Sequence, residues 1–317
     1  MKLGIITSGG DAPGMNVAVR AVVRYAIKNG FEVYGYKDGY KGILENNFER
    51  LYNRSVSGLL NKGGTILGTS RVPEFLNSSV QLKAAQNMKD FGITNLIAIG
   101  GDGTYHGAYE LDKLGINVVG IPGTIDNDVA LTDFTLGFHT ALNTINEAVD
   151  KLRDTSSSHK RCAIVEVMGR NCGDLAIYAG ICGGAEMINT PENRLKKEDV
   201  IEKLKKMKNE DRSYALFITT EKMYDNLADF AHEITEKSGF HAVPTVLGYI
   251  QRGGSPSSED RLLGTQMGIY AVELVVKGIH GVAVGIRNTK IVHDSFLDVF
   301  ATKRKKSKLY DLLEEVS

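Results

Sequence analysis

Short apolar runs rich in β-branched residues alternate with longer stretches of helical periodicity along most of the chain. The glycine-rich and charged loops stand where these apolar runs end. This alternation is typical of β–α–β units, in which a helix connects two parallel strands. In an open parallel sheet, ligands bind beyond the carboxyl ends of the strands. The sequence therefore predicts an α/β protein whose loops at one sheet edge carry the function.

The pattern predicts strands over 3–7, 31–36, 95–99, 117–121, 162–167, 214–219 and 245–250, and helices over 15–28, 81–91, 141–153, 195–208 and 260–277. A domain usually holds roughly 100–200 residues. The length of 317 residues therefore suits two domains or one large α/β unit.

Charge and cysteine content exclude several classes of protein. The 38 basic residues balance 38 acidic ones, so the chain lacks the basic excess that binding nucleic acid requires. No apolar run has the length of a membrane span or of a signal-peptide core. Cys162, Cys172 and Cys182 are odd in number and have neither a disulfide nor a metal-site spacing. We expect a cytoplasmic protein that binds neither nucleic acid nor membranes.

Six of the 35 glycines lie in two loops that suit phosphate groups. The first, Ser8–Gly14, links a strand to a helix N-terminus, where free N–H groups bind anions. It is not a Walker loop, because Met15 and Asn16 follow Gly14. The second, Gly100–Thr104, places Asp102 between glycines. That carboxylate suits a hydrated Mg²⁺ on phosphate oxygens, and the alternative is a helix N-cap.

Two further sets of side chains point to phosphoryl transfer. The segment Thr124–Asp128 carries two carboxylates, one of which can accept the proton of an acceptor alcohol; an Asx turn is the alternative. Four arginines that suit phosphate follow strand ends or glycine-rich loops, although each alone could be a surface ion pair: Arg71, Arg161, Arg170 and Arg252.

Seven motifs together resemble the bacterial ATP-dependent 6-phosphofructokinase family. In chain order they are TSGGDAPGMN at 7–16, GGTILGTSR at 63–71, IGGDGT at 99–104, PGTIDND at 122–128, VEVMGR at 165–170, GGAE at 183–186 and TVLGYIQRGGSP at 245–256. GGDGT alone also occurs in NAD kinases and lipid kinases. The set as a whole is specific, and it covers essentially the whole chain.

The resemblance implies transfer of the ATP γ-phosphoryl group to the 1-hydroxyl of fructose 6-phosphate in glycolysis, with Mg²⁺. It implies two similar three-layer α/β/α domains and a homotetramer with active sites at subunit boundaries. The larger, ATP-binding domain would hold residues 1–138 and about 254–303, and the smaller, sugar-phosphate-binding domain about 139–253 and 304–317.

The resemblance also assigns roles to residues. Asp126 matches the general base, and the residues matching its catalytic partners are Thr124, Asp128 and Arg170. The nucleotide contacts match Gly10, Tyr40, Arg71, Val72, Gly101, Asp102, Gly103 and Thr104, with Asp102 as the magnesium ligand. The sugar-phosphate contacts match Thr124, Ile125, Asp126, Arg161, Met168, Gly169, Arg170, Glu221, Val243, Tyr249, Ile250, Gln251 and Arg252, with Arg161 reaching in from a neighbouring subunit.

Four positions bear on donor and acceptor choice. Pyrophosphate-dependent relatives carry Asp at the position of Gly103 and Lys at that of Gly123, so glycine at both predicts open space for ATP. The family usually has Arg where Val243 stands and His where Tyr249 stands. Because both hold the sugar 6-phosphate, the chain is expected to bind it more weakly. A kinase for a related acceptor such as tagatose 6-phosphate, and a sugar-phosphate sensor without catalysis, are the alternatives.

The family's effector site for ADP or phosphoenolpyruvate matches Arg20, Arg24, Arg153, Gly184, Ala185, Glu186 and Arg212. Glu210 and Ser213 replace residues that are usually basic, and Gly58 replaces one that is usually acidic. The site's positive charge falls, so weaker allosteric control is expected.

Overall fold

The computed structural model describes residues 1–304 and 307–316, so Lys305, Lys306 and Ser317 of the predicted smaller domain lie outside the described residues. The chain divides into two compact units. The larger holds Met1–Ile125, Val129–Thr140 and Arg252–Arg304, and the smaller holds Asp126–Asp128, Ala141–Gln251 and Lys305–Ser317. Each unit is an α/β structure with a mainly parallel sheet, which confirms the predicted fold class.

The larger unit is built on a seven-stranded sheet in the order β11-β10-β5-β4-β1-β2-β3. Its strands are β1 (Lys2–Thr7), β2 (Glu32–Tyr36), β3 (Phe48–Leu51), β4 (Ile93–Gly100), β5 (Asn117–Pro122), β10 (Val282–Arg287) and β11 (Lys290–Ser295). Only β3 and β11, at the two edges, run antiparallel to their neighbours.

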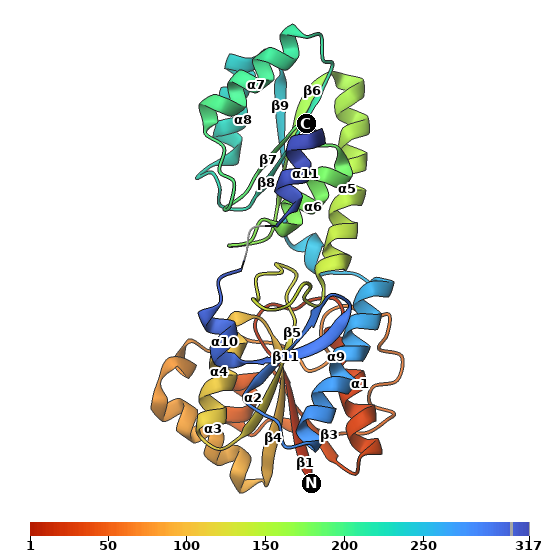
Figure 1. Ribbon diagram of the computed structural model, residues 1–317, viewed down its shortest axis with the longest axis vertical. Helices are drawn as coiled ribbons and strands as arrows, with labels where there is room; N and C mark the ends of the chain where they lie inside the picture. Colours follow the sequence, from red (N-terminus) through yellow and green to blue (C-terminus); the bar gives the residue numbers. More distant parts are fainter. Residues whose placement is uncertain (305–306, 317) are drawn as a thin grey trace. The chain divides into compact units, whose positions relative to one another are not determined.

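Helices cover both faces of this sheet (Figure 1). Helices α1 (Met15–Lys28) and α9 (Ser258–Val276) pack together on one face. The other helical segments are α2 (Tyr40–Glu45), η1 (Pro73–Leu76), α3 (Ser78–Asp90), α4 (Asp102–Lys113) and α10 (Phe296–Ala301). The central strands are buried on both faces, as their continuous apolar sequences predict.

The smaller unit has a four-stranded parallel sheet in the order β7-β8-β6-β9. Its strands are β6 (Arg161–Val167), β7 (Met187–Asn189), β8 (Ala215–Thr220) and β9 (His241–Val246). The helical segments are α5 (Phe138–His159), whose first residues belong to the larger unit, α6 (Asp174–Gly183), α7 (Lys197–Asn209), α8 (Leu227–Ser238), η2 (Gly248–Arg252) and α11 (Leu309–Val316). One core packs α7 and α8 against the sheet.

One predicted strand is wrong. Strand β9 ends at Val246, within the run predicted as a strand over 245–250. The chain turns at Gly248, which has a φ of +54°, and continues as the 3₁₀ turn η2. Pro244 lies within β9, which is tolerated because β9 is an edge strand with a free hydrogen-bonding side.

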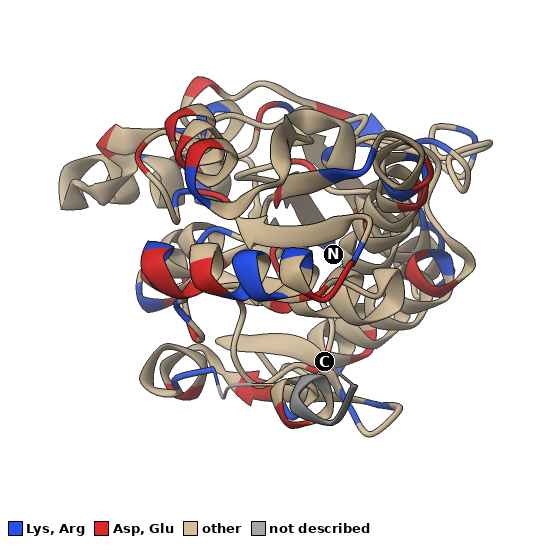
Figure 2. Cartoon of the chain, turned by 90° about the horizontal axis from the view of Figure 1, so that it is seen from above, with Lys and Arg blue, Asp and Glu red and all other residues tan. Residues whose placement is uncertain are grey.

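The surface carries acidic and basic residues on the same helices (Figure 2). Pairs one turn apart, such as Lys151–Glu147 and Lys237–Glu233, lie within 2.7 Å. None of the helices in the described part of the chain combines the length and apolarity that a membrane span requires. Cys162 and Cys172 are buried and Cys182 is exposed.

Candidate active site

In the larger unit, three loops meet because β1, β4 and β5 are neighbours in the sheet. The backbone N–H of Ser8 donates to the Ile99 carbonyl at 3.0 Å, and that of Gly123 donates to the Gly100 carbonyl at 2.9 Å. The Thr104 hydroxyl donates to the Ser8 carbonyl at 3.1 Å. The predicted nucleotide loops are therefore joined at one sheet edge.

A fourth segment completes this edge. The Asn16 side chain, buried in α1, donates to the carbonyls of Lys62 and Gly63 at 3.1 and 3.0 Å and accepts the Ile66 N–H at 2.8 Å. The Thr69 hydroxyl donates to the Gly9 carbonyl at 2.7 Å. These bonds fix the approach to Arg71, whose side chain is exposed.

Asp102 is the first residue of α4, and Gly101 is the N-cap, so the alternative reading of Asp102 as the cap is wrong. Its carboxylate is 60% exposed and lies 3.7 Å from His106 Nε2. Within residues 1–304 and 307–316, no three His, Cys, Asp or Glu side chains converge as a metal site. A lone exposed carboxylate fits a Mg²⁺ that takes most of its ligands from phosphate oxygens and water.

Tyr40 and Val72 lie under this loop region. The Tyr40 hydroxyl donates to the Thr104 carbonyl at 2.5 Å, and its ring stacks on Phe75. Burial raises the pKa of Tyr40 far above its usual range. Val72 packs partly buried against the same core. Tyr40 therefore supports the backbone that carries Asp102 and Thr104.

Arg252 lies beside the first loop. A Cβ on Gly10 would stand 3.4 Å from the Arg252 guanidinium carbon. The larger unit thus brings a predicted nucleotide contact and a predicted sugar contact together, although 242 residues separate them in the sequence.

The smaller unit positions the loop after β6. Gly169 has a φ of +139°, and Arg170 has a φ of +56° with an exposed side chain. The Arg170 N–H donates to Glu221 Oε1 at 3.2 Å, and the Glu221 N–H donates to the Val167 carbonyl at 2.7 Å. The ends of β6 and β8 therefore hold Arg170 and Glu221 next to each other.

Gln251 is fully buried, and its amide accepts from Met168 and donates to Gly248. Tyr249 and Ile250 are 79% and 60% exposed. Of the predicted sugar contacts Tyr249, Ile250 and Gln251, the structure thus exposes the first two and buries the third.

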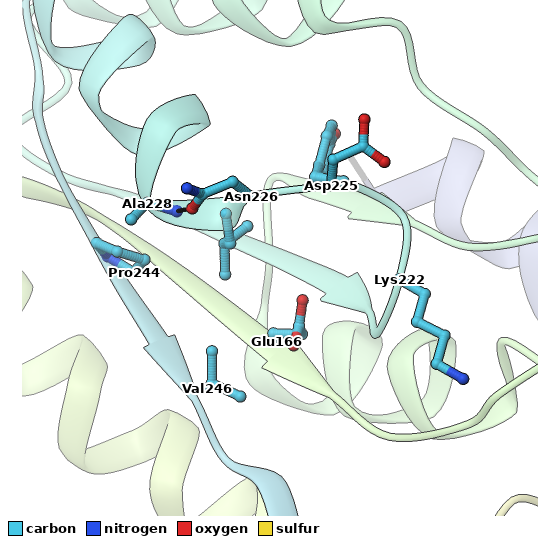
Figure 3. Close-up of a pocket in the computed structure, with 9 residues that line it drawn as sticks. Glu166, Lys222, Asp225, Asn226, Ala228, Pro244 and Val246 are labelled. Carbon is cyan, nitrogen blue, oxygen red and sulfur yellow. Dashed lines mark hydrogen bonds between the residues drawn. The ribbon is translucent and has the colours of Figure 1, made fainter.

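Two cavities lie on opposite faces of the edge strand β9. Arg161 and Val243 line a small cavity of about 40 Å³ together with residues of α5. Glu166, Pro244 and Val246 line a pocket of about 450 Å³ beside Lys222 and Asp225 (Figure 3). The pKa of Glu166 is raised mainly by burial and also by the negative charge of Glu221.

The model of the family described as phosphofructokinase matches residues 2–275. The chain belongs to the phosphofructokinase family. An ATP-dependent 6-phosphofructokinase of Photobacterium profundum is 50% identical over 99% of both chains. One of Edwardsiella ictaluri is 49% identical, covering 96% of this chain and 95% of its own. The solved phosphofructokinase of Saccharomyces cerevisiae has a TM-score of 0.87 at 34% identity, covering 95% of this chain and 45% of that one.

The two glycines that bear on the choice of phosphoryl donor have different surroundings. A Cβ on Gly103 would meet no atom within 4 Å, as the expected open space requires. A Cβ on Gly123 would stand 2.9 Å from the Met15 methyl carbon and 3.1 Å from Ile99. The space beside Gly103 is therefore open, whereas the space beside Gly123 is lined by Met15 and Ile99.

The predicted effector residues fall in both units. Arg20 and Arg24 lie one turn apart on α1. The pKa of Arg20 is lowered mainly by burial and also by the positive charge of Arg24. In the smaller unit, Gly184 ends α6 with a φ of +64°, and a Cβ there would stand 3.7 Å from Arg153. The Glu186 carboxylate accepts the Leu216 N–H at 2.7 Å, Ala185 is buried and Arg212 is exposed.

Sequence reasoning missed three polar residues that hold these loops: Asn16, Asn127 and Asp174, which are 1%, 0% and 7% exposed. Asn16 and Asp174 interrupt otherwise apolar stretches that open helices, and such an interruption is the available signal for a buried polar contact. Asn127 lies between Asp126 and Asp128, and the motif assigns roles to these two carboxylates but none to Asn127.

Proposed function

We propose that this chain is an ATP-dependent 6-phosphofructokinase, which phosphorylates fructose 6-phosphate in glycolysis. The observation that carries the proposal is the near-50% identity to enzymes of that name over almost the full length of both chains. The open space beside Gly103 supports a nucleotide rather than pyrophosphate as donor.

In the proposed mechanism Asp126 accepts the proton of the sugar 1-hydroxyl as that oxygen attacks the γ-phosphorus. The bond from this phosphorus to the oxygen that bridges it to the β-phosphorus breaks, and ADP leaves. Thr124, Asp128 and Arg170 surround the transferring group, and the Arg170 guanidinium offsets its developing charge. Asp102 would hold Mg²⁺, which would neutralise negative charge on the phosphate groups.

The binding roles divide between the units. We assign ATP to the larger unit through Gly10, Arg71 and the Gly101–Thr104 loop. We assign the sugar phosphate chiefly to the smaller unit through Arg161, Met168, Glu221 and the exposed face of η2, with Arg252 added from the larger unit. These roles follow from the family resemblance and from the placement of these residues at the strand ends.

The finer assignments are also proposals. A homotetramer in which Arg161 serves a neighbouring subunit's site follows from the family pattern, as do a cytoplasmic location and an effector site for ADP or phosphoenolpyruvate. Glu210 ends α7 beside Lys206 at 3.9 Å, where its negative charge opposes anion binding. We therefore infer weak control by anionic effectors.

The test is an assay coupled to ADP release with fructose 6-phosphate, tagatose 6-phosphate and fructose as acceptors. A parallel assay supplies pyrophosphate in place of ATP and measures fructose 1,6-bisphosphate. We expect the highest kcat/KM with fructose 6-phosphate and ATP, and no turnover with pyrophosphate. Higher kcat/KM with tagatose 6-phosphate would favour the related acceptor. The observation behind this alternative is Val243, which stands where the family usually has arginine. No turnover with any acceptor would favour a non-catalytic sensor.

A further inference from the structure

The segment Asp126–Asp128 belongs to the smaller unit, whereas Ile125 and Val129 on either side belong to the larger. Its central residue, Asn127, is fully buried and has a φ of +53°. Few side chains adopt this left-handed conformation, and asparagine is one of them. Asparagine thus suits this turn, and Asn127 packs as part of the smaller unit.

Two hydrogen bonds hold Asn127 in the smaller unit. Asn127 Nδ2 donates to Asp174 Oδ2 at 2.8 Å, and both side chains are buried. The Cys172 thiol donates to the Asn127 carbonyl at 3.6 Å. A buried hydrogen bond to a carboxylate is stronger than one between neutral groups. Asn127 is thus held through its side chain and its backbone by the residues that lead into α6.

The start of α6 is itself fixed from behind. Gly173, its N-cap, donates its N–H to both carboxylate oxygens of Glu192, at 3.0 and 3.1 Å. The Tyr310 hydroxyl, on the C-terminal helix α11, donates to Glu192 Oε2 at 3.3 Å and shares a 2.5 Å hydrogen bond with Thr190. A Cβ on Gly173 would stand 2.5 Å from the Thr190 Cβ, so this backbone packs closely on Thr190 and leaves no space for a side chain.

We propose that Asp174 is a positioning residue of the phosphoryl-transfer reaction, acting through Asn127 on the carboxylates of Asp126 and Asp128, with Glu192 and Tyr310 holding Asp174 in turn. The inference rests on the proposed function, which makes Asp126 the base. Because the two aspartates flank Asn127, a rotation of its backbone displaces both carboxylates. A displacement of about 1 Å at a reacting group can lower the rate roughly 100-fold.

The test compares Asp174→Leu, which removes the acceptor, with Asp174→Asn, whose amide oxygen can accept the same hydrogen bond. We expect Asp174→Leu to lower kcat roughly 100-fold and to leave the KM for ATP within about threefold. Asp174→Asn recovers most of the lost kcat. Asp229→Leu is the matched control, because Asp229 is also in the first turn of a helix of this unit but is exposed.

A double-mutant cycle separates positioning from a general structural role. In an Asp126→Ser background, Asp174→Leu should lower the residual kcat by much less than it does in the wild type, since one of the two carboxylates that it positions, the base, is gone. Tyr310→Phe in the wild-type background lowers kcat by less than Asp174→Leu does. Circular dichroism melting of each variant shows that the chain is folded at the assay temperature.

Two outcomes overturn the inference in different ways. Equal losses from Asp174→Leu with and without Asp126 would overturn the positioning role and leave the proposed function intact. Wild-type turnover by Asp126→Ser itself would overturn the assignment of the base and this inference with it.

Discussion

The side-chain oxygen of Gln251 accepts a hydrogen bond from the backbone N–H of Met168 at 3.0 Å, and both residues are buried. The Gln251 amide nitrogen donates to the Gly248 carbonyl at 2.9 Å. One side chain thus joins the loop after β6 to the turn η2. These are the two segments of the smaller unit to which we assign the sugar phosphate.

Replacing Gln251 with leucine should raise the KM for fructose 6-phosphate about 10-fold or more and change kcat less. An apolar side chain leaves the buried Met168 N–H without an acceptor, at a cost of about 1–3 kcal/mol. Gln251→Glu should behave differently with pH. The protonated acid has the donor and acceptor of glutamine, whereas the carboxylate has no donor for Gly248.

The measurement is the KM ratio of variant to wild type from pH 5.5 to 8.5. For Gln251→Glu the ratio should rise with pH, and for Gln251→Leu it should stay flat. A flat, wild-type-like ratio for both variants would show that the loop is held by other contacts.

Asp126→Ser should lower kcat by about two to four decades and leave the KM values for ATP and sugar nearly unchanged, because the base acts in the transition state. The measurement is steady-state kinetics with both substrates varied. A variant that keeps more than about a tenth of wild-type turnover would remove Asp126 from the role of base.

Val243→Arg should lower the KM for fructose 6-phosphate about 10-fold and leave kcat largely unchanged. Val243 and Arg161 line the same small cavity, so the new guanidinium would join Arg161 on the sugar's 6-phosphate. The gain is scaled from the about 1.5–3 kcal/mol of a charged hydrogen bond, less the ordering of the side chain. Val243→Gln, which adds length without charge, is the control.

The same pair predicts a change in stability. Without an anion the two guanidinium groups repel, so Val243→Arg should melt below wild type in low salt and recover when inorganic phosphate is added. Because salt screens these charges, the kinetics of wild type and variant are compared at one fixed salt concentration. An unchanged KM for the arginine variant would mean that other residues bind the 6-phosphate.

Glu166→Gln should stabilise the protein at pH 8 and not at pH 4. The pKa of Glu166 is raised by burial and by Glu221, so the folded state binds its proton more tightly than the unfolded state. Stability from this group is therefore present at low pH and falls as pH rises from the unfolded pKa of about 4.3 through the folded value.

The expected rise in Tm at pH 8 is on the order of 1–2 °C, since the side chain is only half-buried. Glu233→Gln serves as the opposite case, because the hydrogen bond from Lys237 lowers the pKa of the partly exposed Glu233 carboxyl. A lower Tm for Glu166→Gln at pH 8 would contradict the expectation.

The sequence predicted most of the buried parallel strands, because continuous β-branched runs followed by glycine identify them. It missed the edge strands β3 and β11, whose sequences FERL and KIVHDS are polar, and it also missed the parallel strands β7 and β10. It placed a strand over 245–250 because Val246, Tyr249 and Ile250 read as apolar, but Gly248 turns the chain there. Edge strands and tight turns depend on partners that the local pattern does not contain.

In the candidate site, too, the local sequence pattern identified some residues and missed those whose role depends on distant contacts. Motifs named the residues at the loop tips, such as Asp102, Asp126 and Arg170. They gave no role to Asn16 or Asp174, because those side chains act on backbone groups distant in the sequence. They also placed Gln251 among the substrate contacts, whereas the structure buries it under the loop it holds.

The two units interleave along the chain, and this sets an order for folding during synthesis. The four strands of the smaller sheet lie within residues 161–246 and emerge from the ribosome as one block. Strand β5, made by residue 122, has no partner on its outer edge until β10 at Val282–Arg287 follows. An unpaired strand edge is open to association with other chains. During synthesis the larger unit thus keeps an unpaired strand edge until β10 is made, and it is the part of the nascent protein that most needs protection from association with other chains.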